Sequence, residues 1–571
     1  MRHPTFAFAA ALLVTAGPVA LAKQPVRQAA ASTRVPGMVS SADPRASEAG
    51  AIMLRKGGSA VDAAFATLLA LDVVEPESQG IGGGSYLVYS PRGTTPVTFD
   101  GREVAPRAAT GTWFYKNGQP LDHEDAIPGG RSVGVPGNLR MMAMAHGRYG
   151  KLPWAALFQP AIKLARDGFT ITPRLYGSLS EAKRTGALSA EGRALFYQAD
   201  GNPKPVGTLV KNPAFAAFLE GIAKNGAESF YRGSNPQAIV ATVNGSAVNP
   251  SKMTLADITS YKVVQRAPVC GTYRGYRICG MGPSSSGGTT VFETLKQLER
   301  FNLSKLGPNS PVAWHLIAES MRLAYADREL YLGDPAYVSV PTAGLMDPAY
   351  LAKRSSLISP DRTMPSVAAG RPRGAPPLVC KPAAQPEHGT SHFVAVDSEG
   401  NVASETSTIE DIFGSGLMVN GYYLNNELTD FNIVPDKNGC PTANRVAGGK
   451  RPRSSMSPSI VWAPNGHVRL AVGAAGGPTI PAQVLKTIIG VIDWHLSAQQ
   501  AIALPVILAP GTDTVYVERG TFLETMMPQL QALGHQVKAI PPGFKANAVE
   551  WVNGRWAGAA DPRSEGAAVS Q

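Results

Sequence analysis

Apolar residues recur at helical spacing from Ala46 to Val74, and Gly57-Gly58 interrupts the pattern. Spacing of this kind predicts amphipathic helix, and a glycine pair favours a break between two helices. We therefore predict two helices packed as a hairpin. The most apolar part, Ala60 to Val74, contains two aspartates and is predicted to be a buried core helix, not a membrane span.

A glycine-rich segment, Gly80 to Gly84, leads into an apolar run from Ser85 to Tyr89 that predicts a strand. A turn from Pro91 to Pro96 separates it from a second short strand, Val97 to Phe99. The glycines do not predict a phosphate loop, because such a loop opens a helix and is followed by Gly-Lys-Ser/Thr. This segment precedes a strand.

The middle of the chain, Pro153 to Asp334, is predicted to be mainly helical, with runs such as Trp154 to Arg166 and Ala313 to Leu332. A further helix, Thr289 to Phe301, follows serines and Gly287-Gly288. This helix entry is either an anion site or, more commonly, an end capped by serine. From Thr363 to His388 the chain is rich in Pro, Gly, Ala and Arg, which predicts an exposed, mobile connection.

After this connection, polar and apolar residues alternate. Ser391 to Val396 and Asn401 to Thr408 predict a hairpin. Two more hairpins are predicted around Asn-Gly turns, the strongest short turn signal. Their residues are Ser457 to Ala463 with His467 to Val472, and Ala548 to Ala560; a helix is predicted from Thr479 to Leu496.

The first residues have the layout of a secretory signal: Arg2 and His3, an apolar run from Phe6 to about Val19, then Ala20-Leu21-Ala22. A membrane anchor is the alternative, but the run is shorter than the roughly 20 residues that a spanning helix needs. We expect residues 1–22 to be an export signal and the mature protein to be periplasmic or secreted. No later segment predicts a membrane span.

The formal net charge is +11, yet no run of five or more Lys or Arg occurs, so we do not predict nucleic-acid binding. Diffuse charge favours solubility or attracts small anions. The four cysteines, Cys270, Cys279, Cys380 and Cys440, are too few and scattered for a metal site. Cys270 and Cys279 flank a predicted turn, Gly271 to Gly275, and are candidates for one disulfide.

Thr390 carries the candidate chemistry, because Gly389-Thr390 joins the predicted connection to the first hairpin. The Thr390 hydroxyl can attack the preceding carbonyl, water can release the ester, and a free amine then lies beside the hydroxyl. That amine, with a reference pKa of about 8, is a suitable base near neutral pH. A small residue at 389 lets the backbone approach closely. Taken alone, Gly-Thr before a strand is also an ordinary loop threonine.

Further motifs make the chain resemble the gamma-glutamyltranspeptidase family of N-terminal nucleophile hydrolases over nearly its whole mature length. The matching stretches, in chain order, are 57–64, 74–84, 100–106, 390–393, 424–431, 450–458 and Gly476-Gly477. The resemblance implies a four-layer αββα fold made from two segments, residues 23–389 and 390–571. It implies cleavage between Gly389 and Thr390, and no metal or organic cofactor.

The resemblance also implies catalytic roles. Thr390 would be nucleophile and, through its amine, general base. Thr408 would orient this pair from the far end of the hairpin. The backbone N–H groups of Gly476 and Gly477 would stabilise the tetrahedral oxyanion.

A γ-glutamyl group carries an α-carboxylate and an α-ammonium, so its pocket needs both charges. The resemblance implies that Arg102 binds the carboxylate, helped by Ser454 and Ser455. Glu427 and Asp430 would bind the ammonium. Taken singly, these residues also fit surface ion pairs and turn-capping serines.

Three departures from the family pattern lie near the substrate. Glu410 stands where an asparagine is usual, and an ionised carboxylate cannot donate a hydrogen bond. Thr429 stands where an acidic residue is common. The segment Asn432 to Gly449 is short and lacks a tyrosine that could gate a lid, which favours water or bulky acceptors.

The expected function is transfer or hydrolysis of γ-glutamyl groups, with glutathione or γ-glutamyl amides as donors and water or an amine as acceptor. One alternative is an acylase for glutaryl side chains such as those of cephalosporin derivatives, which lack the ammonium. Another is an exported binding protein that keeps the fold and is never cut.

Overall fold

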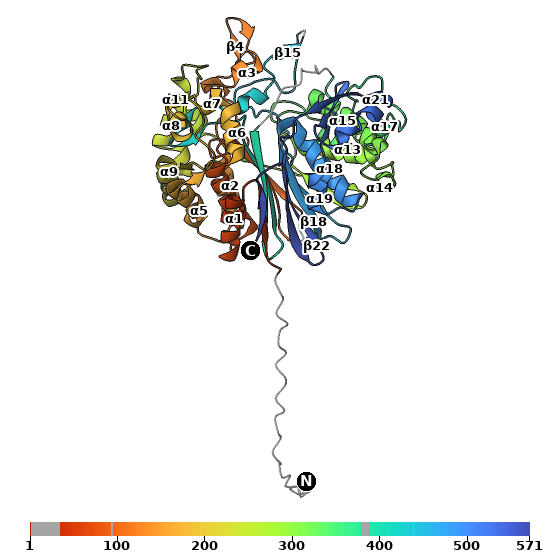
Figure 1. The fold of residues 1–571 in the computed structure, drawn as a ribbon, viewed down its shortest axis with the longest axis horizontal. Helices are drawn as coiled ribbons and strands as arrows, with labels where there is room; N and C mark the ends of the chain where they lie inside the picture. The colour runs from red at the N-terminus through yellow and green to blue at the C-terminus, as the bar shows by residue number, and fades with distance from the viewer. Residues whose placement is uncertain (2–34, 93–94, 378–388, 438) are drawn as a thin grey trace. The chain divides into compact units, whose positions relative to one another are not determined.

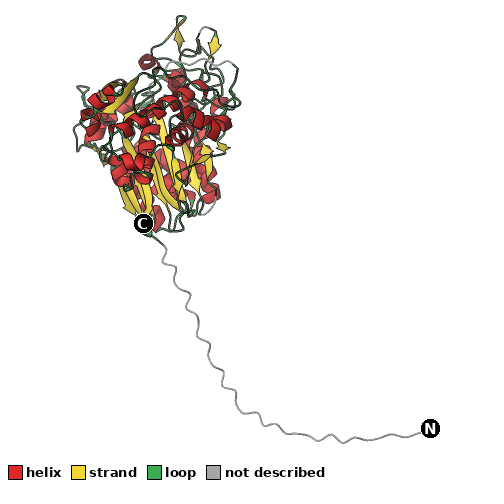
Figure 2. Cartoon of the chain, turned by 90° about the vertical axis from the view of Figure 1, so that its right-hand side faces the viewer, coloured by secondary structure: helices red, strands yellow, loops and turns green. Residues whose placement is uncertain are grey.

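The computed structural model describes Met1 and residues 35–92, 95–377, 389–437 and 439–571. Within the unit Val35–Gln571, two sheets pack face to face between layers of helices, as Figures 1 and 2 show. This confirms the predicted αββα sandwich. Apart from Met1, the predicted export signal lies outside the described residues, as do Cys380 and the end of the predicted connection.

The first sheet is antiparallel and has the order β24-β1-β11-β12-β2-β3-β8. Three of its strands follow position 390 in the chain and four precede it, so segments from both sides of the predicted cleavage site interleave. The strands are β1 (Met38–Ser41), β2 (Gly84–Ser90), β3 (Val97–Asp100), β8 (Val264–Arg266), β11 (Gly389–Val396), β12 (Val402–Glu410) and β24 (Ala567–Ser570).

The second sheet, also antiparallel, has the order β23-β22-β18-β17-β10-β9. It too combines both parts of the chain, because β9 and β10 precede position 390 and the other strands follow it. The strands are β9 (Val269–Tyr273), β10 (Tyr276–Gly280), β17 (Ser459–Trp462), β18 (Val468–Ala475), β22 (Lys545–Val552) and β23 (Arg555–Ala560).

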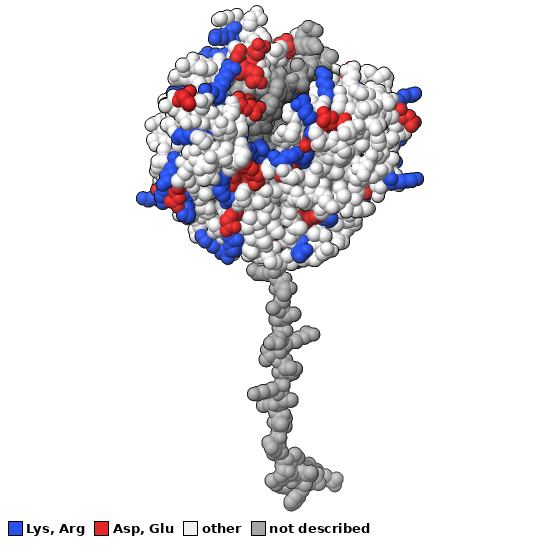
Figure 3. Space-filling view, viewed as in Figure 1, with Lys and Arg blue, Asp and Glu red and all other residues white. Residues whose placement is uncertain are grey.

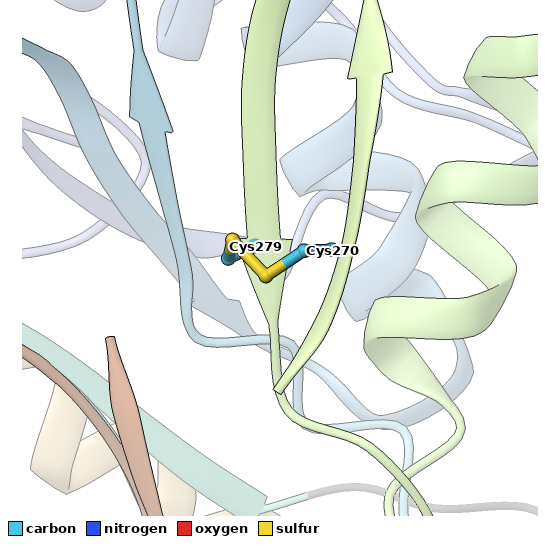
Figure 4. Close-up of a disulfide and its surroundings, with 2 residues drawn as sticks. All are labelled: Cys270 and Cys279. Carbon is cyan, nitrogen blue, oxygen red and sulfur yellow. A yellow bond between two sulfur atoms is a disulfide. The ribbon is translucent and has the colours of Figure 1, made fainter. Parts of the chain in front are cut away.

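A disulfide joins Cys270 to Cys279 across β9 and β10, where the two residues are paired in register (Figure 4). The predicted turn between them was too long: β9 continues to Tyr273, so the strands are linked only by Arg274-Gly275, both at positive φ. Cys440 is also disulfide-bonded.

Two helices cover the outer face of the first sheet, α1 (Pro44–Arg55) and α2 (Ala60–Val74), which are the predicted helix hairpin. Ser59 and Asp62 form a capping box that starts α2. The second sheet is covered by α13 (Gly287–Leu298) and α18 (Ile480–Ile492), with α15 (Pro311–Tyr331) packed on α13. No helix in the described part of the chain is long and apolar enough to cross a membrane.

Strand β11 shows how the layers are held together. Phe393 and Ala395 pack into the apolar cluster that contains α1 and α2, while Val394 and Val396 pack into the cluster that contains β18 and α18. Successive side chains of a strand point to opposite faces. Strand β11, which begins at Gly389, therefore lies between the two apolar clusters, with alternate side chains in each.

Two buried histidines connect α15 with the C-terminal part of the chain. The imidazole nitrogens His315 Nδ1 and His535 Nε2 are 2.7 Å apart, and His315 Nε2 lies 2.7 Å from the Ser359 carbonyl oxygen. The His315 ring therefore donates to the Ser359 carbonyl oxygen and accepts from His535. Burial lowers the pKa of both, that of His535 to about 3.

We expect this pair to make the protein sensitive to acid. An unfolded histidine binds a proton near about pH 6.5, whereas the folded pair resists it, so the free energy of unfolding should decrease as pH falls from about 6.5 towards 3. Denaturant unfolding at pH 7 and pH 5 should show a smaller pH dependence in His535→Asn than in the wild type. The exposed His467 is the matched control, and an equal reduction in His467→Asn would contradict the assignment.

Candidate active site

Thr390 is the second residue of β11, at a point where the pairing with β12 changes register. Gly389 is paired with Glu410, and Thr390 is only 6% exposed. A Cβ atom on Gly389 would lie 2.8 Å from the Glu410 backbone oxygen. A larger residue at 389 would therefore push the two strands apart.

The hydroxyls of Thr390 and Thr408 meet at the carbonyl of Gly389. The Thr390 Oγ1 lies 2.6 Å from the Gly389 oxygen and 3.4 Å from the Thr408 Oγ1. The Thr408 hydroxyl donates to the same Gly389 oxygen and accepts from the Glu410 N–H at 2.8 Å. The bond between Gly389 and Thr390 thus has a polarised carbonyl with a hydroxyl beside it.

Removal of the Thr408 hydroxyl should slow cleavage of this bond. Thr408→Val keeps the shape of the side chain and removes one donor to the developing oxyanion, a loss that typically costs about 10²-fold in rate. The fraction of cut chain should be followed on denaturing gels after rapid purification. Thr406→Val is the control, because Thr406 lies on the same strand but bonds to His392. Equally slow cleavage in both variants would contradict a specific role for Thr408.

One small cavity, with a volume of about 10 Å³, brings the predicted site residues together. Figure 3 shows a hollow in this face of the molecule, above the two sheets of Figure 1, with Lys, Arg, Asp and Glu side chains along its rim. Of the predicted residues only Gly476 is not part of the cavity lining. The lining consists of Arg102, Gly389, Thr390, Thr408, Glu410, Glu427, Asp430, Ser454, Ser455, Met456, Gly477 and Ile480.

The predicted oxyanion site is the turn from β18 into α18. Gly476 and Gly477 both have positive φ, 113° and 53°, which favours glycine at these positions. Gly477 begins a short 3-10 helix, where backbone N–H groups lack an intrahelical partner. The Thr479 hydroxyl holds the turn by donating to the Gly476 oxygen at 2.7 Å, and Gln483 donates to the Ala475 oxygen at 2.6 Å. Sequence reasoning missed these two supporting residues.

Arg102 follows β3 in the chain and is only 1% exposed. It forms ion pairs with both Glu427 and Asp430. It also donates to the Arg453 carbonyl oxygen at 3.0 Å. The two carboxylates raise the pKa of Arg102 although burial alone would lower it. The groups predicted to bind opposite ends of a zwitterion therefore pair with each other across the cavity.

Glu410 is buried at the end of β12, and its backbone has a φ of 80°. Its Oε2 accepts hydrogen bonds from Asn426 and, at 3.3 Å, from Thr429. Burial, followed by the nearby carboxylates of Asp430, Asp411 and Glu427, raises the pKa of Glu410 well above its usual range. The raised pKa favours the neutral acid, which can donate a hydrogen bond as an asparagine would.

Ser454 and Ser455 line the cavity without bonding to Arg102. The Ser455 hydroxyl accepts from Arg328 at 2.5 Å, and the Ser454 hydroxyl accepts from the Met456 N–H at 3.1 Å. Ser286, at the start of α13, does not cap that helix; its hydroxyl donates to the Ser454 oxygen at 2.7 Å. The α13 entry thus supports the serine loop, an arrangement that the prediction of a capped helix missed.

The segment Asn432 to Gly449 contains a hairpin of two short strands, β15 (Asp436–Lys437) and β16 (Cys440–Pro441). A surface cavity of about 470 Å³ lies between this hairpin and residues 109–111. Among the described residues, no group of three or more His, Cys, Asp or Glu side chains is arranged to hold a metal ion.

The chain is similar to characterised proteins over most of its length. Residues 46–571 match the family described as gamma-glutamyltranspeptidase. The glutathione hydrolase proenzyme of Bacillus subtilis (strain 168) is 36% identical over 93% of this chain and 91% of its own length. The acylase ACY 1 proenzyme of Pseudomonas sp. (strain SE83) is 34% identical over 94% of this chain and 93% of its own.

Among solved structures, the cephalosporin acylase of Bacillus halodurans superposes with a TM-score of 0.82 at 26% identity, over 94% of this chain and 96% of its own. Together with the sandwich fold, these similarities show an N-terminal nucleophile enzyme of the gamma-glutamyltransferase and hydrolase kind. The chain belongs to the gamma-glutamyltranspeptidase family.

Proposed function

We propose that this protein is an exported proenzyme that cuts itself between Gly389 and Thr390 and then transfers γ-glutamyl groups from amides to water or an amine. The observation that carries the proposal is the meeting of the Thr390 hydroxyl, the Gly389 carbonyl and the Thr408 hydroxyl in the cavity that also contains Arg102. The signal over residues 1–22 supports export.

Cleavage proceeds by attack of the Thr390 oxygen on the Gly389 carbonyl carbon. The bond from this carbon to the Thr390 nitrogen breaks, the nitrogen takes a proton, and the peptide becomes an ester. Water then hydrolyses the ester, leaving a carboxylate on Gly389 and a free amine on Thr390. The pieces 23–389 and 390–571 stay associated, because each of the two sheets contains hydrogen-bonded strands from both pieces.

In the mature enzyme the Thr390 amine accepts the proton of its own hydroxyl as the oxygen attacks the γ-carbonyl of the donor. Negative charge develops on the carbonyl oxygen, where the N–H groups of Gly476 and Gly477 stabilise it. The leaving amine takes the proton, and a γ-glutamyl ester on Thr390 remains. Water or an acceptor amine then attacks this ester and restores the threonine.

The ion pairs of Arg102 favour a zwitterionic head group. An α-carboxylate that binds Arg102, next to Ser454 and Ser455, competes with Glu427 and Asp430 for the guanidinium. The α-ammonium of a γ-glutamyl donor supplies these carboxylates with a new cation. A glutaryl group has no ammonium and would leave two buried carboxylates without compensation, which is costly.

The main alternative function is that of an acylase acting on glutaryl side chains. The similarity to the ACY 1 and cephalosporin acylases supports considering it. Turnover of a γ-glutamyl anilide and a glutaryl anilide by the purified, cut enzyme separates the two. We expect a higher kcat/KM for the γ-glutamyl compound; equal or better turnover of the glutaryl compound would support the acylase. Glutathione is the natural donor to test next.

A binding protein that is never cut is the rival of another class. N-terminal sequencing of the smaller fragment should give Thr390-Ser391-His392. An intact purified chain without amidase activity would support the binding protein.

A further inference from the structure

We propose that Glu410 determines donor selectivity: while it holds its proton the site tolerates a head group without an ammonium, and when it has lost the proton the site requires one. This inference rests on the proposed function. It concerns a residue at which the chain departs from its family, so the family's usual subsite does not supply it.

The backbone fixes the Glu410 carboxyl in place. Glu410 is the last residue of β12, its φ of 80° is unusual for a residue with a side chain, and its N–H is bonded to Thr408 at 2.8 Å. Strained backbone of this kind is often found at functional sites. Because Thr408 also contacts the Gly389 carbonyl, the backbone of Glu410 and the bond proposed to react are held by the same hydroxyl.

The two carboxyl oxygens have different environments. Oε2 accepts from Asn426 and Thr429, whereas Oε1 is buried and has no hydrogen-bond partner among the described residues. In a protonated acid one oxygen accepts and the other carries the hydrogen. The proton therefore belongs on Oε1, which leaves an O–H donor in a residue that lines the cavity.

Burial, and after it the neighbouring carboxylates, raise the pKa of Glu410 and favour the protonated form. Asp411 follows it on its own segment, and Glu427 and Asp430 face it from the 3-10 helix Glu427–Asp430. Arg102 is the one cation among the residues that line the cavity, and it is already paired with the latter two carboxylates. No cation of the lining is left for Glu410.

Three carboxyl groups, those of Glu410, Glu427 and Asp430, line the cavity with the single guanidinium of Arg102. Glu103, next to Arg102 in the chain, is a further buried acid outside the lining, and burial raises its pKa to about 7. A donor that brings an ammonium adds the missing cation and favours release of the Glu410 proton to solvent. A glutaryl donor adds only negative charge, so it favours the protonated form.

The test is the ratio of kcat/KM for γ-glutamyl p-nitroanilide to that for glutaryl p-nitroanilide, measured from about pH 5 to about pH 7.5. The Thr390 amine and the oxyanion site serve both substrates, so their titration cancels in the ratio. In the wild type the ratio should rise by about tenfold or more over this range, since one pH unit changes the ionised fraction up to tenfold. In Glu410→Gln it should be independent of pH.

Glu405→Gln is the matched control, because Glu405 is a buried acid on the same strand, with a pKa raised to about 8 by burial, and does not line the cavity. This variant should keep the wild-type slope. A flat ratio in the wild type, an unchanged slope in Glu410→Gln, or loss of the slope in Glu405→Gln would overturn the inference.

A second measurement covers the case in which Glu410→Gln fails to fold. Calorimetry of wild-type enzyme in buffers of different ionisation enthalpy should show proton release on binding of glutamate and none on binding of glutarate. Equal proton exchange for the two ligands would also overturn the inference. If the wild-type chain stays uncut and hydrolyses neither anilide, the proposed function itself has failed, which is a different outcome.

Discussion

Thr390→Ala should remain a single chain and should lose amidase activity by on the order of 10⁶-fold, as expected when a catalytic nucleophile is removed. Alanine lacks the oxygen that lies 2.6 Å from the Gly389 carbonyl oxygen, so neither the internal ester nor the acyl-enzyme can form. Gel electrophoresis under denaturing conditions and an anilide assay on the same sample measure both effects.

Thr390→Ser is the matched control, because it keeps the hydroxyl and loses only a methyl group. It should still be cut and should still turn over the donor. The fold of Thr390→Ala should match that of the other variant, since Thr390 contributes little to the apolar clusters on either side of β11. A chain break between positions 389 and 390 in the alanine variant would rule out the proposed nucleophile.

Arg102→Met should lower both stability and donor use. Glu427 and Asp430 would remain buried without their cation, a change that typically costs about 3–5 kcal/mol in the free energy of unfolding. Loss of the partner of the substrate carboxylate should reduce kcat/KM for γ-glutamyl p-nitroanilide by on the order of 10²-fold or more. Urea unfolding and steady-state kinetics measure the two effects separately.

A triple variant distinguishes binding from general destabilisation. Adding Glu427→Gln and Asp430→Asn to Arg102→Met removes the uncompensated charges, so most of the lost stability should return. The kcat/KM should not recover, because the carboxylate of the donor still lacks a cation and its ammonium has also lost the carboxylates of Glu427 and Asp430. Recovery of both quantities would mean that Arg102 acts only through the stability of the fold.

The secondary structure near the site was predictable because local pattern determines it. Strict alternation after Ser391 and the Asn465-Gly466 turn identified the two hairpins that carry the site. The predicted ends of these strands were less accurate. Strand β11 begins at Gly389 because this glycine pairs with Glu410. Such pairing cannot be recognised from the order of polar and apolar residues. The helix predicted to reach Leu496 ends at Ile492.

The partners of the site residues were less predictable, because they are far apart in the sequence. Resemblance identified Arg102 and Glu427, but not that they pair with each other across 325 positions. It also could not show that Arg328, in the last turn of α15, donates to Ser455. The raised pKa of Glu410 depends on burial and on three neighbouring carboxylates, none of which a motif reveals.

The strand order of the first sheet opposes the exchange of chain segments between two molecules in the same cell. Strand β11 lies between β1, from before position 390, and β12, from after it, while β24 from the C-terminal end closes the far side of β1. If the chain is cut before Thr390, the two pieces could not exchange between molecules without breaking strand pairs in both sheets. An inactive variant would then keep both of its own pieces. It would not take a piece from an active molecule produced in the same cell.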